Sequence, residues 1–306
     1  MLEGDEADAA VASARRRTTA RSHLAHHPRF EDVSPEVGVL DEDAVASGME
    51  EDPDAVLALL ADLTGATDVH LRRLSRRLAA RLFVDITRSG PARRRGVGRL
   101  RTAPFRADGS DLDLDASLST LVETRAGLGL DPTRLRVQAW HRPELAVCLL
   151  VDRSGSMGGA PLATAALAAA AVAWRVPDDH SVLAFAKDVV AVRSQGTAKP
   201  TSRVVDELLG LRGVGTTDLA GALTAARQQL DRSTAGRRLT VLLSDCRATV
   251  HGDALAAARA LDEVAVVAPD GDAEEATAFA AAVGARLVTV GGPGDVVAAL
   301  SAVFER

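Results

Sequence analysis

From residue 144 onward, short apolar runs rich in β-branched residues alternate with helical segments. The strand-like runs are 145–151, 181–186, 189–192, 239–244, 263–268 and 286–290. The helical runs are about 161–175, 202–211, 218–231, 252–261, 273–283 and 294–304. Several of these strands are apolar almost throughout, so both of their faces are covered. The alternation predicts an α/β fold with a doubly wound, mostly parallel, six-stranded sheet.

The second and third strands form an exception to the parallel order. Only two residues separate 181–186 from 189–192, which is too short a link for a crossover helix. This pair is therefore predicted to be an antiparallel hairpin at an edge of the sheet.

The chain before residue 143 predicts a helical N-terminal region. Residues 1–50 are polar and show no sustained apolar period, which indicates an extension that is partly disordered or helical, loosely ordered with one helix. Residues 51–142 would form the helical region, and 143–306 the α/β domain. Within 54–88 two helical patterns follow each other, and the second has leucines on one face and arginines on the other. The leucines are Leu71, Leu74, Leu78 and Leu82, and the arginines are Arg72, Arg73, Arg76 and Arg77. A solvated basic face is the favoured interpretation, and an anion site is the alternative.

Polar residues gather where the predicted strands end. The first strand runs into Asp152, Ser154 and Ser156, and the fourth ends at Ser244-Asp245. Between them, Thr217 and Asp218 precede a helix. Ligands of open α/β sheets bind beyond the carboxyl ends of the strands, so these residues are the candidates for a site.

These residues form an oxygen-rich set. Asp152, Ser154 and Ser156 alternate, so in an extended loop their side chains point the same way. With Thr217 and Asp245 they supply two carboxylates and three hydroxyls. Hard cations such as Mg²⁺ prefer oxygen ligands, at roughly 2.0–2.1 Å, and usually retain water. The set predicts a divalent-cation site for Mg²⁺, or for Mn²⁺ or Ca²⁺.

The ordered motifs DRSGSM, GTTDL and LLSD resemble the metal-ion-dependent adhesion site of von Willebrand factor type A (VWA) domains. The resemblance implies that Ser154, Ser156 and Thr217 contact the metal through hydroxyls. It also implies that Asp152 and Asp245 hold the metal directly or through water. One coordination position would stay open for an Asp or Glu of a protein partner.

Two neighbouring features bear on this site. Asp218 either supports the ligands from behind or caps the following helix. The helix at 161–175 begins near the site, so its amino terminus adds positive potential for an anionic ligand.

A narrower resemblance covers roughly residues 90–306. VWA proteins of the CoxE type, which work with MoxR-type AAA+ ATPases, carry a basic loop and then a Leu-Asp-Leu segment before a helix. Here these are Arg93–Arg101, Leu112-Asp113-Leu114 and Ser117-Leu118, although Asp115-Ala116 stands where relatives often have Arg. The resemblance implies an adaptor for a MoxR-type ATPase or its client. Chelatase-type subunits, which also have an AAA+ partner, are an alternative.

Composition excludes several classes of function. The formal charge is −6, aromatic residues make up 3% and tyrosine is absent, which argues against binding to nucleic acid, even by the loop at 93–101. No secretory segment begins the chain, and its longest apolar run is too short to span a membrane. Cys148 and Cys246 lack metal-ligand spacing and are expected to be buried, unpaired thiols, so we predict a cytoplasmic protein.

The motifs also argue against an enzyme. A Walker A motif and a nucleophile elbow are absent, and Ser154 stands where an aspartyl phosphatase needs a second acid. His141, His180 and His251 lack zinc-site spacing. We therefore expect no catalysis, with a hydrolytic enzyme at the metal site as an alternative. The last helix, at 295–304, is expected to be an ordinary packed helix rather than a switch.

Overall fold

The structure of this protein is a computed structural model that describes residues 1–88, 99–104, 111–125, 135–141, 145–153, 159–211, 213 and 215–305. Ser154, Ser156 and most of the predicted basic loop lie outside these described residues. The chain divides into two compact units. The larger combines Met1–Gly90, Ala146–Thr234 and Arg238–Arg306, and the smaller combines Pro91–Leu145 with Ala235–Arg237.

The larger unit is built on a six-stranded sheet with the order β6-β5-β4-β7-β8-β9. Its strands are β4 (Leu145–Asp152), β5 (His180–Phe185), β6 (Val189–Arg193), β7 (Arg237–Leu243), β8 (Glu263–Pro269) and β9 (Arg286–Val290). Neighbours β4 and β5, β7 and β8, and β8 and β9 pair in parallel. β6 lies at an edge and pairs with β5 antiparallel, which confirms the predicted hairpin. The predicted fold class is confirmed.

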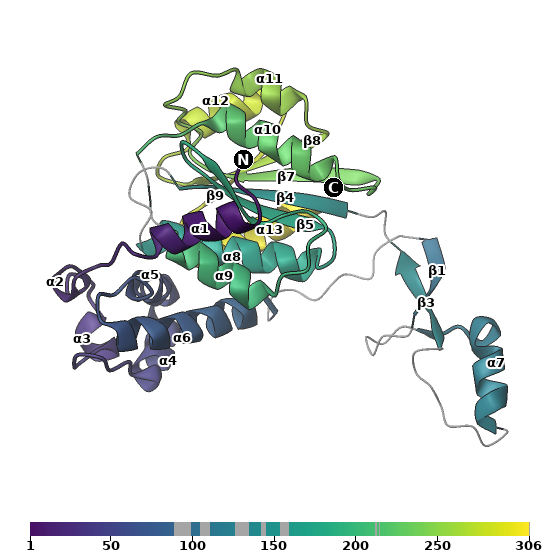
Figure 1. The fold of residues 1–306 in the computed structure, drawn as a ribbon, viewed down its shortest axis with the longest axis horizontal. Helices are drawn as coiled ribbons and strands as arrows, with labels where there is room; N and C mark the ends of the chain where they lie inside the picture. Colours follow the sequence, from purple (N-terminus) through teal and green to yellow (C-terminus); the bar gives the residue numbers. More distant parts are fainter. Residues whose placement is uncertain are drawn as a thin grey trace. The chain divides into compact units, whose positions relative to one another are not determined.

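Helices cover both faces of this sheet. On one face lie α8 (Gly159–Arg175), α9 (Thr201–Gly210) and α13 (Val296–Phe304) (Figure 1). On the other lie α10 (Leu219–Leu230), α11 (Ala254–Arg259) and α12 (Glu274–Val283) (Figure 1). A short 3₁₀ helix, η2 (Pro293–Asp295), leads into α13. This covering is the reason that the central strand β4 is buried along almost its whole length.

α8 is the central helix of the larger unit. Every residue from Leu162 to Ala173 is buried, and most of them are alanines. Small side chains let neighbouring helices approach closely, and α8 packs against α5, α6, α9 and α13. The apolar run that contains α8 is therefore a core helix.

The N-terminal helices form a further layer on α8. α5 (Pro53–Leu63) and α6 (Val69–Arg88) both pack against α8, and α6 also packs against α9. The leucines predicted on one face of α6 include Leu71 and Leu78, which are buried, and Leu82, which packs against the same cluster. Residues 1–90 thus belong to the same compact unit as the sheet.

Residues 1–50 differ from the expectation of a loosely ordered segment with one helix. They carry α1 (Asp5–Ala14), α2 (Arg21–Leu24), α3 (Phe30–Val33) and most of α4 (Glu42–Glu51). Leu24, Phe30, Val33 and Val45 are buried in one cluster with the leucines of α5. These apolar residues are too widely spaced to show a period, so only their packing on α5 reveals them as core.

The smaller unit contains a three-stranded antiparallel sheet and one helix. Its strands are β1 (Arg99–Pro104), β2 (Asp111–Leu112) and β3 (Arg136–His141), in the order β1-β3-β2. α7 (Leu114–Arg125) follows β2. Asp113 caps α7 through the Ala116 amide and accepts a hydrogen bond from Thr102 Oγ1 at 2.6 Å. The β1–β3 pairing was not expected, because it joins segments more than thirty residues apart.

Among the helices that the structure describes, none is long and apolar enough to cross a lipid bilayer.

Candidate functional site

The carboxyl ends of β4 and β7 lie side by side at the point where the strand order reverses. β4 leads to β5 on one side, and β7 leads to β8 on the other. Such a switch point is where open α/β sheets bind ligands. Asp152 ends β4, and Ser244-Asp245 follow β7 directly.

Ser244 connects these two strand ends. Its hydroxyl donates a hydrogen bond to Asp152 Oδ2 at 2.6 Å and accepts one from the Cys246 amide at 2.9 Å. Ser244 is buried, whereas Asp152 is half-buried. The bond holds the Asp152 carboxylate toward β7. We did not predict a role for Ser244, although its place beside Asp245 in LLSD is a signal that could have suggested one.

Asp245 also lies close to this group. Its Oδ1 accepts a hydrogen bond from the Arg247 amide at 3.0 Å, which turns the chain sharply after the strand. Cys246, the next residue, has a φ of 63°, in the left-handed region that non-glycine residues rarely adopt. Burial raises the pKa of the Cys246 thiol to about 12, and the charges of Asp245 and Asp152 raise it further in the same direction. Asp245 follows Ser244, which bonds to Asp152, so the two carboxylates stand at adjacent strand ends.

Hydrogen bonds to the segment that follows Asp245 hold Thr217 in place. Its amide donates to Thr249 Oγ1 at 2.7 Å, and its carbonyl accepts from the amides of Thr249 and Val250 at 3.1 Å. The Thr217 side chain is buried. These hydrogen bonds to described residues use the backbone of Thr217 and not its side chain.

Asp218 caps α10. Its Oδ1 accepts from the Gly221 amide at 2.8 Å, which is the capping alternative that the sequence left open. The Asp218 amide donates to the carbonyl of Ala186, just after β5, at 2.8 Å. Thr217 and Asp218 are thus tied to the strand next to β4 on one side and to residues 249–250 on the other.

The structure links Asp152 to Ser244, the residue before Asp245, and holds Thr217 to Thr249 and Val250, while Ser154 and Ser156 are not described. Carboxylate and hydroxyl oxygens are the donors that a hard divalent cation prefers, so the described residues fit such an ion. Within the described ranges, no three His, Cys, Asp or Glu side chains gather so that they could hold a metal ion. The predicted set has only two carboxylates, and its other ligands are hydroxyls.

A carboxylate from the N-terminal helices contacts the first turn of α8. Asp62, in α5, accepts a hydrogen bond from the Gly159 amide at 2.8 Å and contacts His27 Nε2 at 2.9 Å. One of the amides expected to favour an external anion therefore already meets a carboxylate of this chain. No motif in the sequence indicated this contact, because 97 positions separate the two residues.

The two cysteines are free and buried, as expected. Burial raises the pKa of the Cys148 thiol to about 12. Both thiols are therefore protonated near neutral pH, the form in which cysteine is inert.

The fold and the polar strand ends together define an α/β domain with a candidate binding edge. Residues 147–248 match the family model for the von Willebrand factor type A domain. The chain therefore contains a VWA domain, a class that commonly mediates protein–protein interaction. No functionally curated protein matches the chain.

Several solved structures resemble the chain in fold. A mutant of the PilB minor pilin from Streptococcus sanguinis is 11% identical with a TM-score of 0.44, over 55% of this chain and 63% of the pilin. An aerotolerance-related membrane protein from Bacteroides fragilis is 16% identical with a TM-score of 0.43, over 53% of this chain and all of that one. A von Willebrand factor type A protein from Catenulispora acidiphila is 18% identical with a TM-score of 0.40, over 53% of this chain and 42% of that one. The chain thus spans less than two thirds of the pilin and of the Catenulispora protein.

Proposed function

We propose that this chain is a protein-binding adaptor that depends on a divalent cation, Mg²⁺ or else Mn²⁺ or Ca²⁺. Asp152, Ser154, Ser156, Thr217 and Asp245 would hold the ion, and Asp218 supports Thr217 through the cap of α10. The ion would supply a concentrated positive charge that attracts an Asp or Glu of the partner. The observation that carries this proposal is the hydrogen bond from Ser244, the residue before Asp245, to Asp152 at the switch point of a VWA domain.

Electrostatics support a cation at this edge. Asp152 ends β4 and Asp245 follows the neighbouring strand β7, and a divalent ion would offset repulsion between two carboxylates at adjacent strand ends. The buried side chain of Thr217 would add a hydroxyl oxygen to this set.

The partner that fits the narrower resemblance is a MoxR-type AAA+ ATPase or its client. The chain would recruit a protein for remodelling, or for insertion of a metal or cofactor. ATP chemistry would belong to the partner, and this chain would not be an enzyme. A chelatase-type subunit, or hydrolysis at the metal site, is the alternative. We expect the protein to work in the cytoplasm.

Calorimetric titration tests the metal. Mg²⁺ or Mn²⁺ is expected to bind at one site, and Asp152→Ala is expected to abolish the binding. Asp270→Ala is the matched control, because Asp270 follows the carboxyl end of β8 but lies outside the proposed ligands. No binding by the intact protein, or equal loss in both variants, contradicts the proposal.

A pull-down from the native cell tests the partner. An AAA+ ATPase that is retained with Mg²⁺, released by EDTA and lost with Asp152→Ala supports the adaptor. Hydrolytic turnover by the isolated chain in Mg²⁺, lost in the same variant, supports an enzyme instead.

A further inference from the structure

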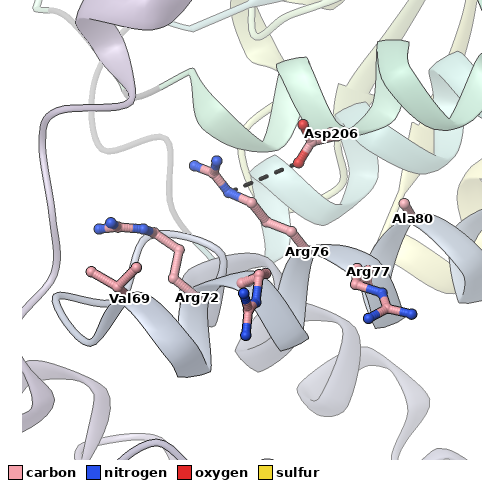
Figure 2. Close-up of a pocket in the computed structure, with 7 residues that line it drawn as sticks. Val69, Arg72, Arg76, Arg77, Ala80 and Asp206 are labelled. Atoms are coloured by element: carbon pink, nitrogen blue, oxygen red, sulfur yellow. Dashed lines mark ion pairs between the residues drawn. The ribbon is translucent and has the colours of Figure 1, made fainter.

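The basic face of α6 borders a pocket that the metal site does not use. Four arginines of α6 and one aspartate of α9 line this pocket, which has a volume of about 380 Å³ (Figure 2). The lining residues are Val69, Arg72, Arg73, Arg76, Arg77, Ala80 and Asp206. We call it the arginine pocket.

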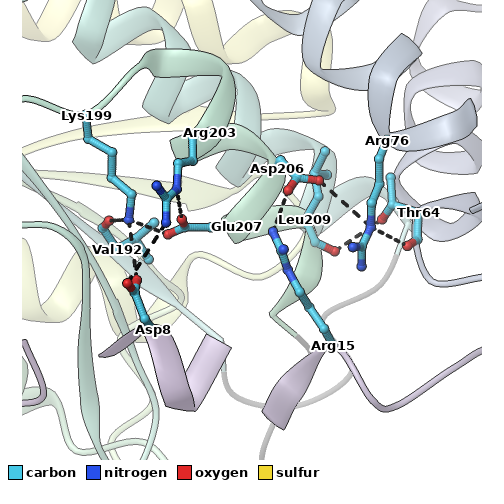
Figure 3. Close-up of polar contacts among 10 residues, drawn as sticks. All are labelled: Asp8, Arg15, Thr64, Arg76, Val192, Lys199, Arg203, Asp206, Glu207 and Leu209. Carbon is cyan, nitrogen blue, oxygen red and sulfur yellow. Dashed lines mark hydrogen bonds and ion pairs between the residues drawn. The ribbon is translucent and has the colours of Figure 1, made fainter. Parts of the chain in front are cut away.

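Part of the positive charge in the arginine pocket is neutralised inside the chain. Arg76 reaches toward α9, where its Nε lies 3.8 Å from Asp206 Oδ1 and donates to the Thr64 carbonyl at 3.1 Å (Figures 2 and 3). Asp206 Oδ2 also accepts from Arg15 at 2.5 Å. The Arg76 side chain is only 20% exposed. Arg76 and Asp206 are therefore structural, and they join α6 to α9.

The contacts of the other three arginines differ from those of Arg76. Arg72 donates to the Ala66 carbonyl at 3.0 Å, and Arg73 contacts His70 Nδ1 at 3.0 Å. Among the residues that the structure describes, no carboxylate pairs with Arg72, Arg73 or Arg77. By contrast, Arg81, one turn further along α6, pairs with Glu42 at 2.7 Å. Three unneutralised guanidinium groups thus stand together on a chain whose formal charge is −6.

The lining also has an apolar part. Val69 is 67% exposed at one end of the pocket, and Ala80 lies further along the helix. The methylene stems of the arginines add apolar surface below their charged ends. No aromatic residue lines the pocket, so a stacked nucleobase has no platform there.

We propose that the arginine pocket binds an acidic segment of a partner protein, with carboxylates against Arg72, Arg73 and Arg77 and an apolar side chain beside Val69. Charge complementarity selects this occupant, because arginine forms paired hydrogen bonds with carboxylates. The apolar border favours a peptide over a bare inorganic anion. Positions 72, 73, 76 and 77 share one face of the helix, so they can meet carboxylates on successive turns of a bound segment.

Fluorescence anisotropy with short labelled peptides tests this proposal. One peptide carries glutamates at helical spacing and one leucine, and its partner peptide has glutamine in place of every glutamate. The protein is first freed of metal by dialysis, so that the proposed cation site contributes nothing. The acidic peptide is expected to bind, and raising the salt to about 1 M is expected to release it, because the Debye length falls to ~3 Å.

Two variants locate the binding. Arg73→Gln with Arg77→Gln is expected to weaken it at least about tenfold, because two exposed charges are removed from the contact. The melting temperature is expected to stay unchanged, since both side chains lie at the surface. Arg81→Gln is the matched control and is expected to bind normally. Equal binding by the double variant, equal binding of the glutamine peptide, or stronger binding of tripolyphosphate or of single-stranded RNA overturns the proposal.

Discussion

Polar side chains lie at both ends of the central sheet, but their burial and their contacts differ. At the amino end, Asp179 accepts hydrogen bonds from Gln195 Nε2 and from Ser233 Oγ, each at 2.5 Å. Gln229 accepts from the Gln195 amide at 2.7 Å and donates to Glu3 at 2.5 Å. His180 and Gln229 are buried there, at 3% and 0% exposure. This end is closed: several of its polar groups bond to one another, while His180 Nε2 and Gln195 Oε1 are buried without a partner among the described residues.

The carboxyl end is open by comparison. Asp152 and Asp245 are half-buried, and the hydrogen bonds that tie Thr217 to other described residues use its backbone. The polar residues at the two ends of this sheet therefore have different roles. Those at the amino end stabilise the fold, and those at the carboxyl end are available to a ligand.

Acidification is expected to destabilise the amino end through His180. Burial and the charge of Arg193 lower the pKa of His180 to about 4, and its Nε2 has no partner among the described residues. A lowered histidine pKa favours the neutral ring in the folded state. The resulting stability is present above pH 6.5 and is lost as the pH falls toward 4, by about 3 kcal/mol in total.

Urea unfolding at several pH values measures this loss. His180→Gln removes the titrating ring, so the variant is expected to lose less stability than the wild type between pH 6.5 and 4. Parallel curves for the two proteins would contradict the assignment to His180.

Gln229→Leu is expected to destabilise the fold without affecting metal binding. The substitution leaves the buried Gln195 amide without its acceptor, which costs about 1–3 kcal/mol. Denaturant unfolding and calorimetric Mg²⁺ titration give the two measurements. Gln228→Leu, at the exposed neighbouring position, is the control and is expected to change neither. Loss of metal binding in Gln229→Leu would contradict the prediction that the amino end affects stability alone.

Thr217→Val is expected to show the opposite behaviour. The substitution keeps the shape of the side chain but removes a proposed metal ligand, so Mg²⁺ affinity is expected to fall at least about tenfold. Stability is expected to change by less than about 1 kcal/mol, because the hydrogen bonds that hold Thr217 in place use its backbone. Thr216→Val is the control, since Thr216 is exposed and lies outside the proposed set. Unchanged affinity in Thr217→Val would remove this residue from the site.

Glu3→Gln is expected to have the smallest effect. The hydrogen bond from Arg232 is the main cause that lowers the pKa of Glu3 to about 2, against the opposing effect of partial burial. A lowered carboxyl pKa gives stability that is present above pH 4.5 and is lost as the pH falls toward 2. The side chain is 32% exposed, so the contribution is less than about 1 kcal/mol.

Thermal unfolding at pH 7 and below pH 3 detects this contribution. The difference between wild type and Glu3→Gln is expected to shrink at the lower pH. Glu6→Gln, at an exposed position, is the control and is expected to follow the wild type throughout. Identical behaviour of the two variants would contradict a stabilising role for Glu3.

The sheet could be predicted from the chain because its signals are local. Each strand is a short apolar run between helical patterns, and the three-residue link between β5 and β6 is too short for a crossover helix. The N-terminal helices before α5 could not be predicted in the same way. Phe30 and Val45 are isolated apolar residues, and only their burial against α5 shows that they belong to the core.

The same limit applies to the candidate site. The sequence by itself determined which oxygens stand at the strand ends, because strand length and polarity place Asp152 and Asp245 there. Three contacts are visible only in the folded structure. Ser244 bonds to Asp152, the segment after Asp245 holds Thr217, and Asp62 accepts a hydrogen bond from the first turn of α8. These contacts join residues far apart in the chain. Packing of whole elements creates them, and no local pattern of residue types records that packing.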